Sequence, residues 1–207
     1  MIKILFIVLF VFNLYLSAFS TYYEDKVSQF KMLSKKSDKQ IVMLGDSLTD
    51  RACWSELANR DNIANRGIDG DTTYGVLQRL NFLTNNTKQV FIMIGTNDLL
   101  REKTVEHVFK NYKKIILDLK KKNITTIVQS TLYIGDNTPS RYNKNIKKLN
   151  SLLSEFSIRN KIIFIDLNTK LAPHGYLKPI YTNDRLHLNA KGYTVWIKTI
   201  KKIMLKK

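Results

Sequence analysis

Short apolar runs recur along the chain, and each ends at a small or polar residue. The first run ends at Gly45, and a similar run later in the chain ends at Gly95. Uninterrupted runs of this length, rich in β-branched residues, are typical of strands buried on both faces in a parallel sheet. The predicted strands cover residues 41–44, 90–94, 124–128 and 162–165, with a weaker candidate at 62–65.

Between these runs, apolar residues recur at intervals of three and four. This spacing predicts amphipathic helices. Asn189 is the expected N-cap of the last helix, and Pro139-Ser140 opens the one before it. Alternating strands and helices favour βαβ units, and hence a three-layer α/β/α sandwich without a second domain. The helical stripes cover residues 76–83, 105–119, 146–156 and 193–203.

The first twenty residues differ from the rest of the chain. Lys3 is their only charge, an apolar run follows, and Ala18-Phe19-Ser20 offers small residues where a signal peptidase cuts. We therefore expect residues 1–20 to be a signal peptide or, alternatively, an uncleaved N-terminal anchor. Either predicts a secreted, periplasmic or membrane-anchored protein facing outside the cytoplasm. Residues 21–39 are polar and lysine-rich, a lead-in segment or peripheral helix, and the folded domain is expected over 40–207.

Composition excludes several classes of protein. The 207 residues are 44% hydrophobic and 25% charged, as in an ordinary soluble domain. One cysteine rules out an internal disulfide framework, and with three histidines it argues against a zinc site, so no metal and no cofactor are expected. The net charge of +17 is carried by scattered lysines. This favours a solvated basic surface over an anionic partner, and no nucleic-acid motif is present.

Candidate chemistry lies in the loops that follow the predicted strands, where open parallel sheets bind ligands. A serine nucleophile needs a base, and the base needs a carboxylate to orient it. Ser47, His187 and Asp184 can supply these three parts. The backbone N–H groups of Ser47 and Gly67 and the side-chain amide of Asn97 are candidate oxyanion donors.

Other reactive residues are weaker candidates for a catalytic role. His107 falls inside a predicted helix, as a surface or packing residue, and His174 falls in a turn. Cys53, beside Trp54, is expected to be a packed thiol without a catalytic role. Asp69 adds a carboxylate after Gly67 that could disfavour anionic substrates.

In this order, Ser47, Gly67, Asn97 and His187 resemble the four markers of the SGNH, or GDSL-type, hydrolase family. The surrounding sequence is similar to the branch related to platelet-activating-factor acetylhydrolase. That similarity lies in Asn65-Arg66-Gly67-Ile68, Gly70-Asp71-Thr72-Thr73, Gly95-Thr96-Asn97-Asp98-Leu99-Leu100, Leu177-Lys178-Pro179 and the segment 181–189. The resemblance implies a flavodoxin-like sheet of about five parallel strands and metal-free hydrolysis of esters or thioesters through an acyl-serine. It also gives Asp98 a structural role.

Together these features predict an exported serine esterase acting on short acyl esters, such as O-acetyl groups of a sugar or glycan. The expected partner is that small-molecule or glycan ester, with membrane association through residues 1–20 left open. Two alternatives stand beside it. One is a lysophospholipase or acyl-thioesterase with the same catalytic set, and the other is a non-catalytic binding module of the cell envelope.

Overall fold

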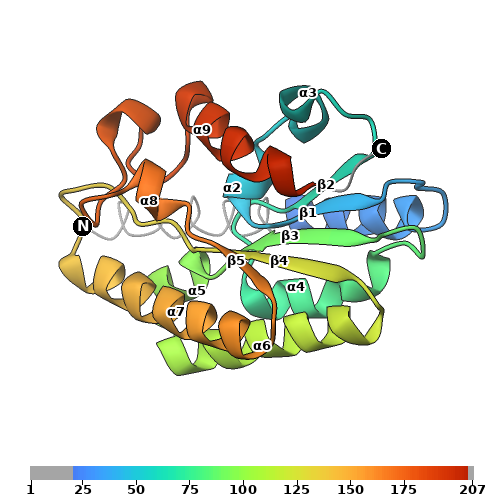
Figure 1. Ribbon diagram of the computed structural model, residues 1–207, viewed down its shortest axis with the longest axis horizontal. Helices are drawn as coiled ribbons and strands as arrows, with labels where there is room; N and C mark the ends of the chain where they lie inside the picture. Colours follow the sequence, from blue (N-terminus) through green and yellow to red (C-terminus); the bar gives the residue numbers. More distant parts are fainter. Residues whose placement is uncertain (1–20, 205–207) are drawn as a thin grey trace, which may run out of the picture.

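Five strands, all parallel, form one sheet in the order β2-β1-β3-β4-β5 in the computed structural model, which describes residues 21–204 (Figure 1). The expectations for residues 1–20 lie outside the described residues. All five predicted strands are present, and the weak candidate extends to Gly67. The strands are β1 (Ile41–Gly45), β2 (Ile63–Gly67), β3 (Gln89–Met93), β4 (Thr125–Gln129) and β5 (Ile163–Ile165).

Helices cover both faces of the sheet and complete the predicted three layers (Figure 1). One face carries α2 (Ser47–Asp50), α3 (Trp54–Ala58), α8 (Asn168–Leu171) and α9 (Ala190–Ile200). The other carries α4 (Thr73–Arg79), α5 (Thr96–Leu100), α6 (Val105–Lys121) and α7 (Ser140–Arg159). Single 3₁₀ turns occur at η1 (Leu80–Phe82), η2 (Pro179–Tyr181) and η3 (Lys201–Ile203). Asn189 caps α9 as predicted, accepting a hydrogen bond from the Gly192 N–H at 3.2 Å.

Each strand contributes to two hydrophobic cores because successive side chains point to opposite faces. In β1, Met43 joins the core under α9, whereas Leu44 joins the core under α6 and α7. The first core contains an aromatic cluster of Trp54, Tyr193 and Trp196. These buried layers explain why the strands read as continuous apolar runs.

The strand order changes direction at β1, and open parallel sheets bind ligands in a crevice at such a switch point. From β1 the chain moves outward to β2 and then returns to the other side of β1 as β3. Such a switch point leaves open space beyond the carboxyl ends of the strands. The register places Gly45 opposite both Gly67 and Met93, so the loops leaving these strands start side by side.

A helix over residues 21–33 packs beside β2 and α4 and is more than a lead-in. Phe30 is buried, with the guanidinium groups of Arg66 and Arg79 5.0 and 5.6 Å from its ring centre. Lys26 pairs with Asp50 at 2.6 Å. No helix within residues 21–204 is both long and apolar enough to cross a membrane.

Replacing Phe30 with alanine should therefore destabilise the whole domain. Truncating a buried phenylalanine typically lowers the free energy of unfolding by about 3–5 kcal/mol. Urea unfolding of Phe30→Ala measures the loss, and Met32→Ala is the matched control because Met32 is 55% exposed on the same helix. Equal stability of the two variants would mean that this helix is not docked in solution.

Candidate active site

A tight turn places Ser47 at the carboxyl end of β1. Asp46 is the N-cap of α2, and its Oδ1 accepts a hydrogen bond from the Leu48 N–H at 3.1 Å. Gly45 permits the turn because a Cβ there would lie 2.3 Å from both the Met93 carbonyl oxygen and Thr49 Oγ1. Ser47 is thus the first residue of α2, where a backbone N–H has no partner inside the helix.

The three predicted catalytic side chains form one hydrogen-bonded chain. His187 Nε2 lies 3.0 Å from Ser47 Oγ, and His187 Nδ1 lies 2.6 Å from Asp184 Oδ2. Ser47 and His187 are 140 positions apart in the sequence, so only the fold brings them together. The arrangement suits proton transfer from serine to imidazole, with the carboxylate orienting the ring.

The loop before α9 holds the carboxylate of this chain in place. Asp184 Oδ1 accepts hydrogen bonds from the backbone N–H groups of His187 at 2.7 Å and Leu186 at 2.9 Å. Partial burial acts to raise the pKa of Asp184, but these bonds and the His187 side chain outweigh it and lower the pKa below its ordinary value. Asp184 therefore stays ionised in acid and can orient His187 over a wide pH range.

Gly67, the second predicted oxyanion donor, sits where no side chain fits. A Cβ at this position would lie 2.2 Å from the backbone nitrogen of Asp50. The Gly67 N–H itself donates to Asn65 Oδ1 at 2.9 Å. Asn65 Nδ2 in turn donates to the carbonyls of Thr49, Asp50 and Ala52, so this amide joins β2 to α2. Nothing in the sequence pattern of a short strand pointed to this role of Asn65.

Asn97, the third predicted donor, is held next to the same crevice. It follows Gly95, whose φ of 115° is in the region that favours glycine, and it is the second residue of α5. Asn97 Nδ2 donates to the Asp71 carbonyl at 2.9 Å. Because an amide nitrogen carries two hydrogens, one remains for a substrate oxygen. Asp98 accepts hydrogen bonds from the Thr73 N–H and Oγ at 2.9 and 2.6 Å, contacts that join α5 to α4.

Comparison with known proteins places this geometry in a family. Residues 43–195 match the model of the GDSL-like lipase/acylhydrolase family. The chain belongs to that family. This family match makes the protein a GDSL-type, or SGNH-type, ester hydrolase, as the sequence resemblance implied.

Several solved structures share the fold of this acylhydrolase. A Streptococcus pneumonia protein assigned as a platelet activating factor superposes with a TM-score of 0.85 at 24% identity, covering 94% of this chain and 98% of the other. A GDSL-like lipase of Bacteroides thetaiotaomicron has a TM-score of 0.73 at 23% identity, over 87% and 96%. An acetyl-xylooligosaccharide esterase of Geobacillus has a TM-score of 0.68 at 17% identity, over 82% and 96%.

Curated relatives by sequence are longer proteins. An N-acylneuraminate cytidylyltransferase of Streptococcus agalactiae serotype III is 32% identical over 166 residues, which cover 78% of this chain but 37% of that protein. An Escherichia coli protein of the same name is 31% identical over 185 residues, 83% of this chain and 40% of that one. The acylhydrolase thus spans less than half the length of these relatives.

The remaining candidate residues are placed away from the reacting atoms or are neutralised. Asp69 pairs with Arg51 at 2.8 Å, so its charge at the site is offset rather than free to repel an anion. Cys53 is exposed at the N-cap of α3, so the expectation of a packed thiol was wrong. His107 lies in α6 beside Asn111, as a surface residue. Within residues 21–204, no cluster of three or more metal-ligating side chains occurs.

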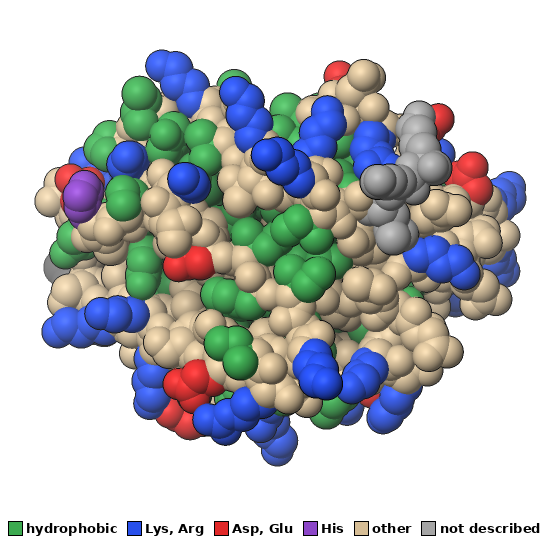
Figure 2. Space-filling view, in the orientation of Figure 1, with side chains coloured by type: hydrophobic (Ala, Val, Ile, Leu, Met, Phe, Trp, Pro, Cys, Tyr) green, Lys and Arg blue, Asp and Glu red, His purple; other side chains and the backbone are tan. Residues whose placement is uncertain are grey.

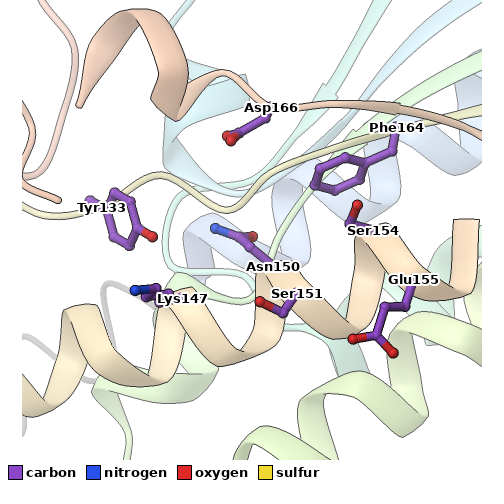
Figure 3. Close-up of a pocket in the computed structure, with 8 residues that line it drawn as sticks. All are labelled: Tyr133, Lys147, Asn150, Ser151, Ser154, Glu155, Phe164 and Asp166. Atoms are coloured by element: carbon purple, nitrogen blue, oxygen red, sulfur yellow. The ribbon is translucent and has the colours of Figure 1, made fainter. Parts of the chain in front are cut away.

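A separate polar groove lies between α7 and the end of β5 (Figure 3). Its volume is about 540 Å³. Tyr133, Lys147 and Asp166 also line the adjoining hollow that reaches His174. Neither hollow is lined by Ser47, Asp184 or His187, and His174 lines only the second of them.

Burial makes Asp46 an unusual acid next to the nucleophile. It is 1% exposed, its Oδ2 has no hydrogen-bond partner, and burial raises its pKa from 3.8 to about 7, with smaller contributions from the nearby charges of Asp71 and Asp98. A carboxyl whose pKa is raised on folding stabilises the protein below its unfolded pKa. That contribution is lost as the pH rises toward and through 7.

Asp46→Asn should remove this pH dependence while keeping the cap, because an asparagine oxygen can still accept from Leu48. The difference in melting temperature between the variant and wild type should increase between pH 4 and pH 8. The increase should be about 2–4 °C for each 1 kcal/mol by which ionised Asp46 destabilises the wild-type protein. Calorimetry across this range checks it. A difference that is constant with pH would show that Asp46 titrates normally.

Asn97→Ala tests the oxyanion role of the amide. Loss of one oxyanion donor typically lowers kcat by about 10²–10³, whereas KM changes little because the ground-state carbonyl carries little charge. The lost bond to Asp71 should also cost about 1 kcal/mol of stability. Steady-state kinetics normalised to folded protein separate the two effects. Full turnover per folded molecule would leave Asn97 with a structural role only.

Proposed function

We propose that this acylhydrolase is an exported esterase that removes short acyl groups, principally O-acetyl, from a sugar or glycan through an acyl-serine intermediate. The observation that carries the proposal is the unbroken chain from Ser47 Oγ through His187 to Asp184, with distances of 3.0 and 2.6 Å. A non-catalytic binding module would have no need for this geometry.

The proposed reaction has two halves. Ser47 Oγ attacks the ester carbonyl carbon while His187 Nε2 takes its proton, and the carbonyl oxygen becomes an oxyanion near Ser47 N–H, Gly67 N–H and Asn97 Nδ2. The oxyanion collapses, the ester C–O bond breaks, and the leaving alcohol receives the proton from His187. Water then attacks the acyl-serine with His187 again as base, which releases the acid and restores Ser47.

Known relatives support a sugar ester as the substrate. Two structural neighbours are an acetyl-xylooligosaccharide esterase and an acetyl xylan esterase. The curated relatives are named for an acidic sugar, N-acylneuraminate, although this chain covers 37–40% of their length. O-acetylated xylosides and O-acetylated N-acylneuraminates are therefore the first substrates to compare. The pairing of Asp69 with Arg51 removes the repulsion that would have disfavoured the acidic sugar.

Export remains part of the proposal and rests on the sequence of residues 1–20. Lysine and arginine are spread over the visible face among neutral and apolar side chains (Figure 2). This distribution supports a solvated basic surface without a nucleic-acid partner. Tyr22, next to the start of the described chain, hydrogen bonds to Asp50, three residues after Ser47.

Ser47→Ala should abolish hydrolysis and leave the melting temperature nearly unchanged, because the only side-chain hydrogen bond of the hydroxyl is to the partly buried imidazole of His187. The assay uses p-nitrophenyl esters of increasing chain length, followed by the two acetylated sugars. We expect the highest kcat/KM for acetate. A maximum at eight or more carbons would favour the lysophospholipase or acyl-thioesterase alternative, and wild-type protein inactive on every ester would support the binding module.

Mass spectrometry of the protein from its native host tests export. We expect a mature N-terminus near Thr21, because Ala18-Phe19-Ser20 precedes it. An intact Met1 in washed membranes would indicate an anchor, and an intact Met1 in the cytoplasmic fraction would contradict export in either form.

A further inference from the structure

Arg79, at the end of α4, places its guanidinium beneath the catalytic crevice. Its side chain is 2% exposed, and each of its three nitrogens donates one hydrogen bond. Nε donates to Asp71 Oδ2 at 2.8 Å, Nη1 to the Arg66 carbonyl at 2.9 Å and Nη2 to the Gly45 carbonyl at 3.0 Å. The planar fork of arginine can hold three acceptors in fixed directions, which a lysine ammonium on its flexible stem cannot reproduce.

Each acceptor is linked to a different predicted oxyanion donor. The Arg66 carbonyl and the Gly67 N–H belong to one planar peptide unit, so a bond to the carbonyl sets the direction of the N–H. It also polarises the peptide and strengthens the N–H as a donor. The Gly45 carbonyl belongs to the peptide unit just before the one that carries the Ser47 N–H.

The third acceptor leads to the side-chain donor. Asp71 receives Arg79 on its carboxylate, and its backbone carbonyl receives Asn97 Nδ2 at 2.9 Å. Close approach at this point is built into the fold, because a Cβ on Gly75 would lie 1.9 Å from Asp71 Oδ1. Asp71 and its neighbour Thr72 are thus fixed between α4 and the crevice.

We infer that Arg79 is a positioning residue for catalysis: by holding Gly45, Arg66 and Asp71 together, its guanidinium aligns all three oxyanion donors at once. The inference rests on the proposed acyl-serine mechanism and adds a residue to it. A purely structural ion pair with Asp71 would need only one of the three bonds. The other two go to backbone carbonyls at the carboxyl ends of β1 and β2, where the donors begin.

Arg79→Lys is the primary test because it keeps the positive charge beside Asp71 but loses the three-point fork. We expect kcat to fall by about 10²-fold, with little change in KM, because small misplacements of catalytic donors cost about this much. The pH dependence of kcat should stay the same, because Arg79 makes none of the hydrogen bonds that join Ser47, His187 and Asp184. An unchanged kcat per folded molecule would overturn the inference.

A double-mutant cycle with Asn97→Ala separates positioning from general damage. If Arg79 acts through the oxyanion donors, of which Asn97 is one, then Arg79→Lys should cost less in the Asn97→Ala background than in wild type. Fully multiplicative losses would mean that Arg79 affects catalysis by another route, and would also overturn the inference. The control is Gln89→Ala, which removes a hydrogen bond to the Ile203 carbonyl at the opposite end of the sheet and should change stability without changing kcat.

A second pair of substitutions and a labelling assay test the inference if Arg79→Lys does not fold or if no ester substrate is found. If Arg79→Lys does not fold, the combined variant Arg79→Met with Asp71→Asn replaces the buried ion pair by uncharged groups of similar size, which proteins often tolerate. The same fall in kcat is expected from it. The rate at which a fluorophosphonate modifies Ser47 is measured in parallel, because it needs no ester substrate. Absence of any ester hydrolysis in wild type would refute the proposed function, whereas wild-type rates of modification in the Arg79 variants would refute the inference alone.

Discussion

The parallel pairing of β1 with both β2 and β3 is the constraint on which the site depends. In this register Gly45 lies opposite Gly67 and Met93, so three loops leave the sheet at one level. The nucleophile follows β1, the backbone donor Gly67 is the last residue of β2, and the side-chain amide of Asn97 follows β3. Glycine at 45 and 67 is what lets the strands and α2 approach so closely, because a Cβ at either position would meet backbone atoms at 2.2–2.3 Å. The close packing of the strand ends is therefore also what brings the catalytic groups together.

The electrostatic arrangement around this point is asymmetric. On the open side, Asp184 is half exposed and is held ionised by N–H groups of its own loop. Beneath the crevice, Asp46, Asp71 and Asp98 are buried close enough for each charge to affect the others, and burial raises the pKa of all three. Arg79 is the buried cation among them. An orienting carboxylate that stays charged, and a buried layer in which Arg79 balances the charge of Asp71, suit a site in which negative charge must develop at the oxyanion.

Much of this could be predicted from the sequence, for identifiable reasons. Continuous apolar runs reveal strands buried on both faces, and Ser47, Asn97 and His187 stand out because they follow such runs or precede the last helix. The helix over 21–33 was harder to interpret, because its contact with the domain depends mainly on Phe30 and on partners far away in the sequence. Asn65 and Arg79 could not be assigned roles at all. Their importance lies in which backbone groups they reach, and neither spacing nor composition encodes that.

The predicted donors also explain why the site needs so many supporting contacts. In the free protein the Gly67 N–H is bonded to Asn65 and one hydrogen of Asn97 to the Asp71 carbonyl. A donor that is already paired avoids the cost of an unsatisfied buried N–H. Asn97 keeps a second amide hydrogen for the reaction, but the Gly67 N–H can serve only if the oxyanion competes with Asn65 for its single hydrogen. The oxyanion displaces the neutral partner because hydrogen bonds to an ionised acceptor are roughly twice as strong as neutral ones. Ground-state carbonyls carry no such charge, so these paired donors favour the transition state over the substrate.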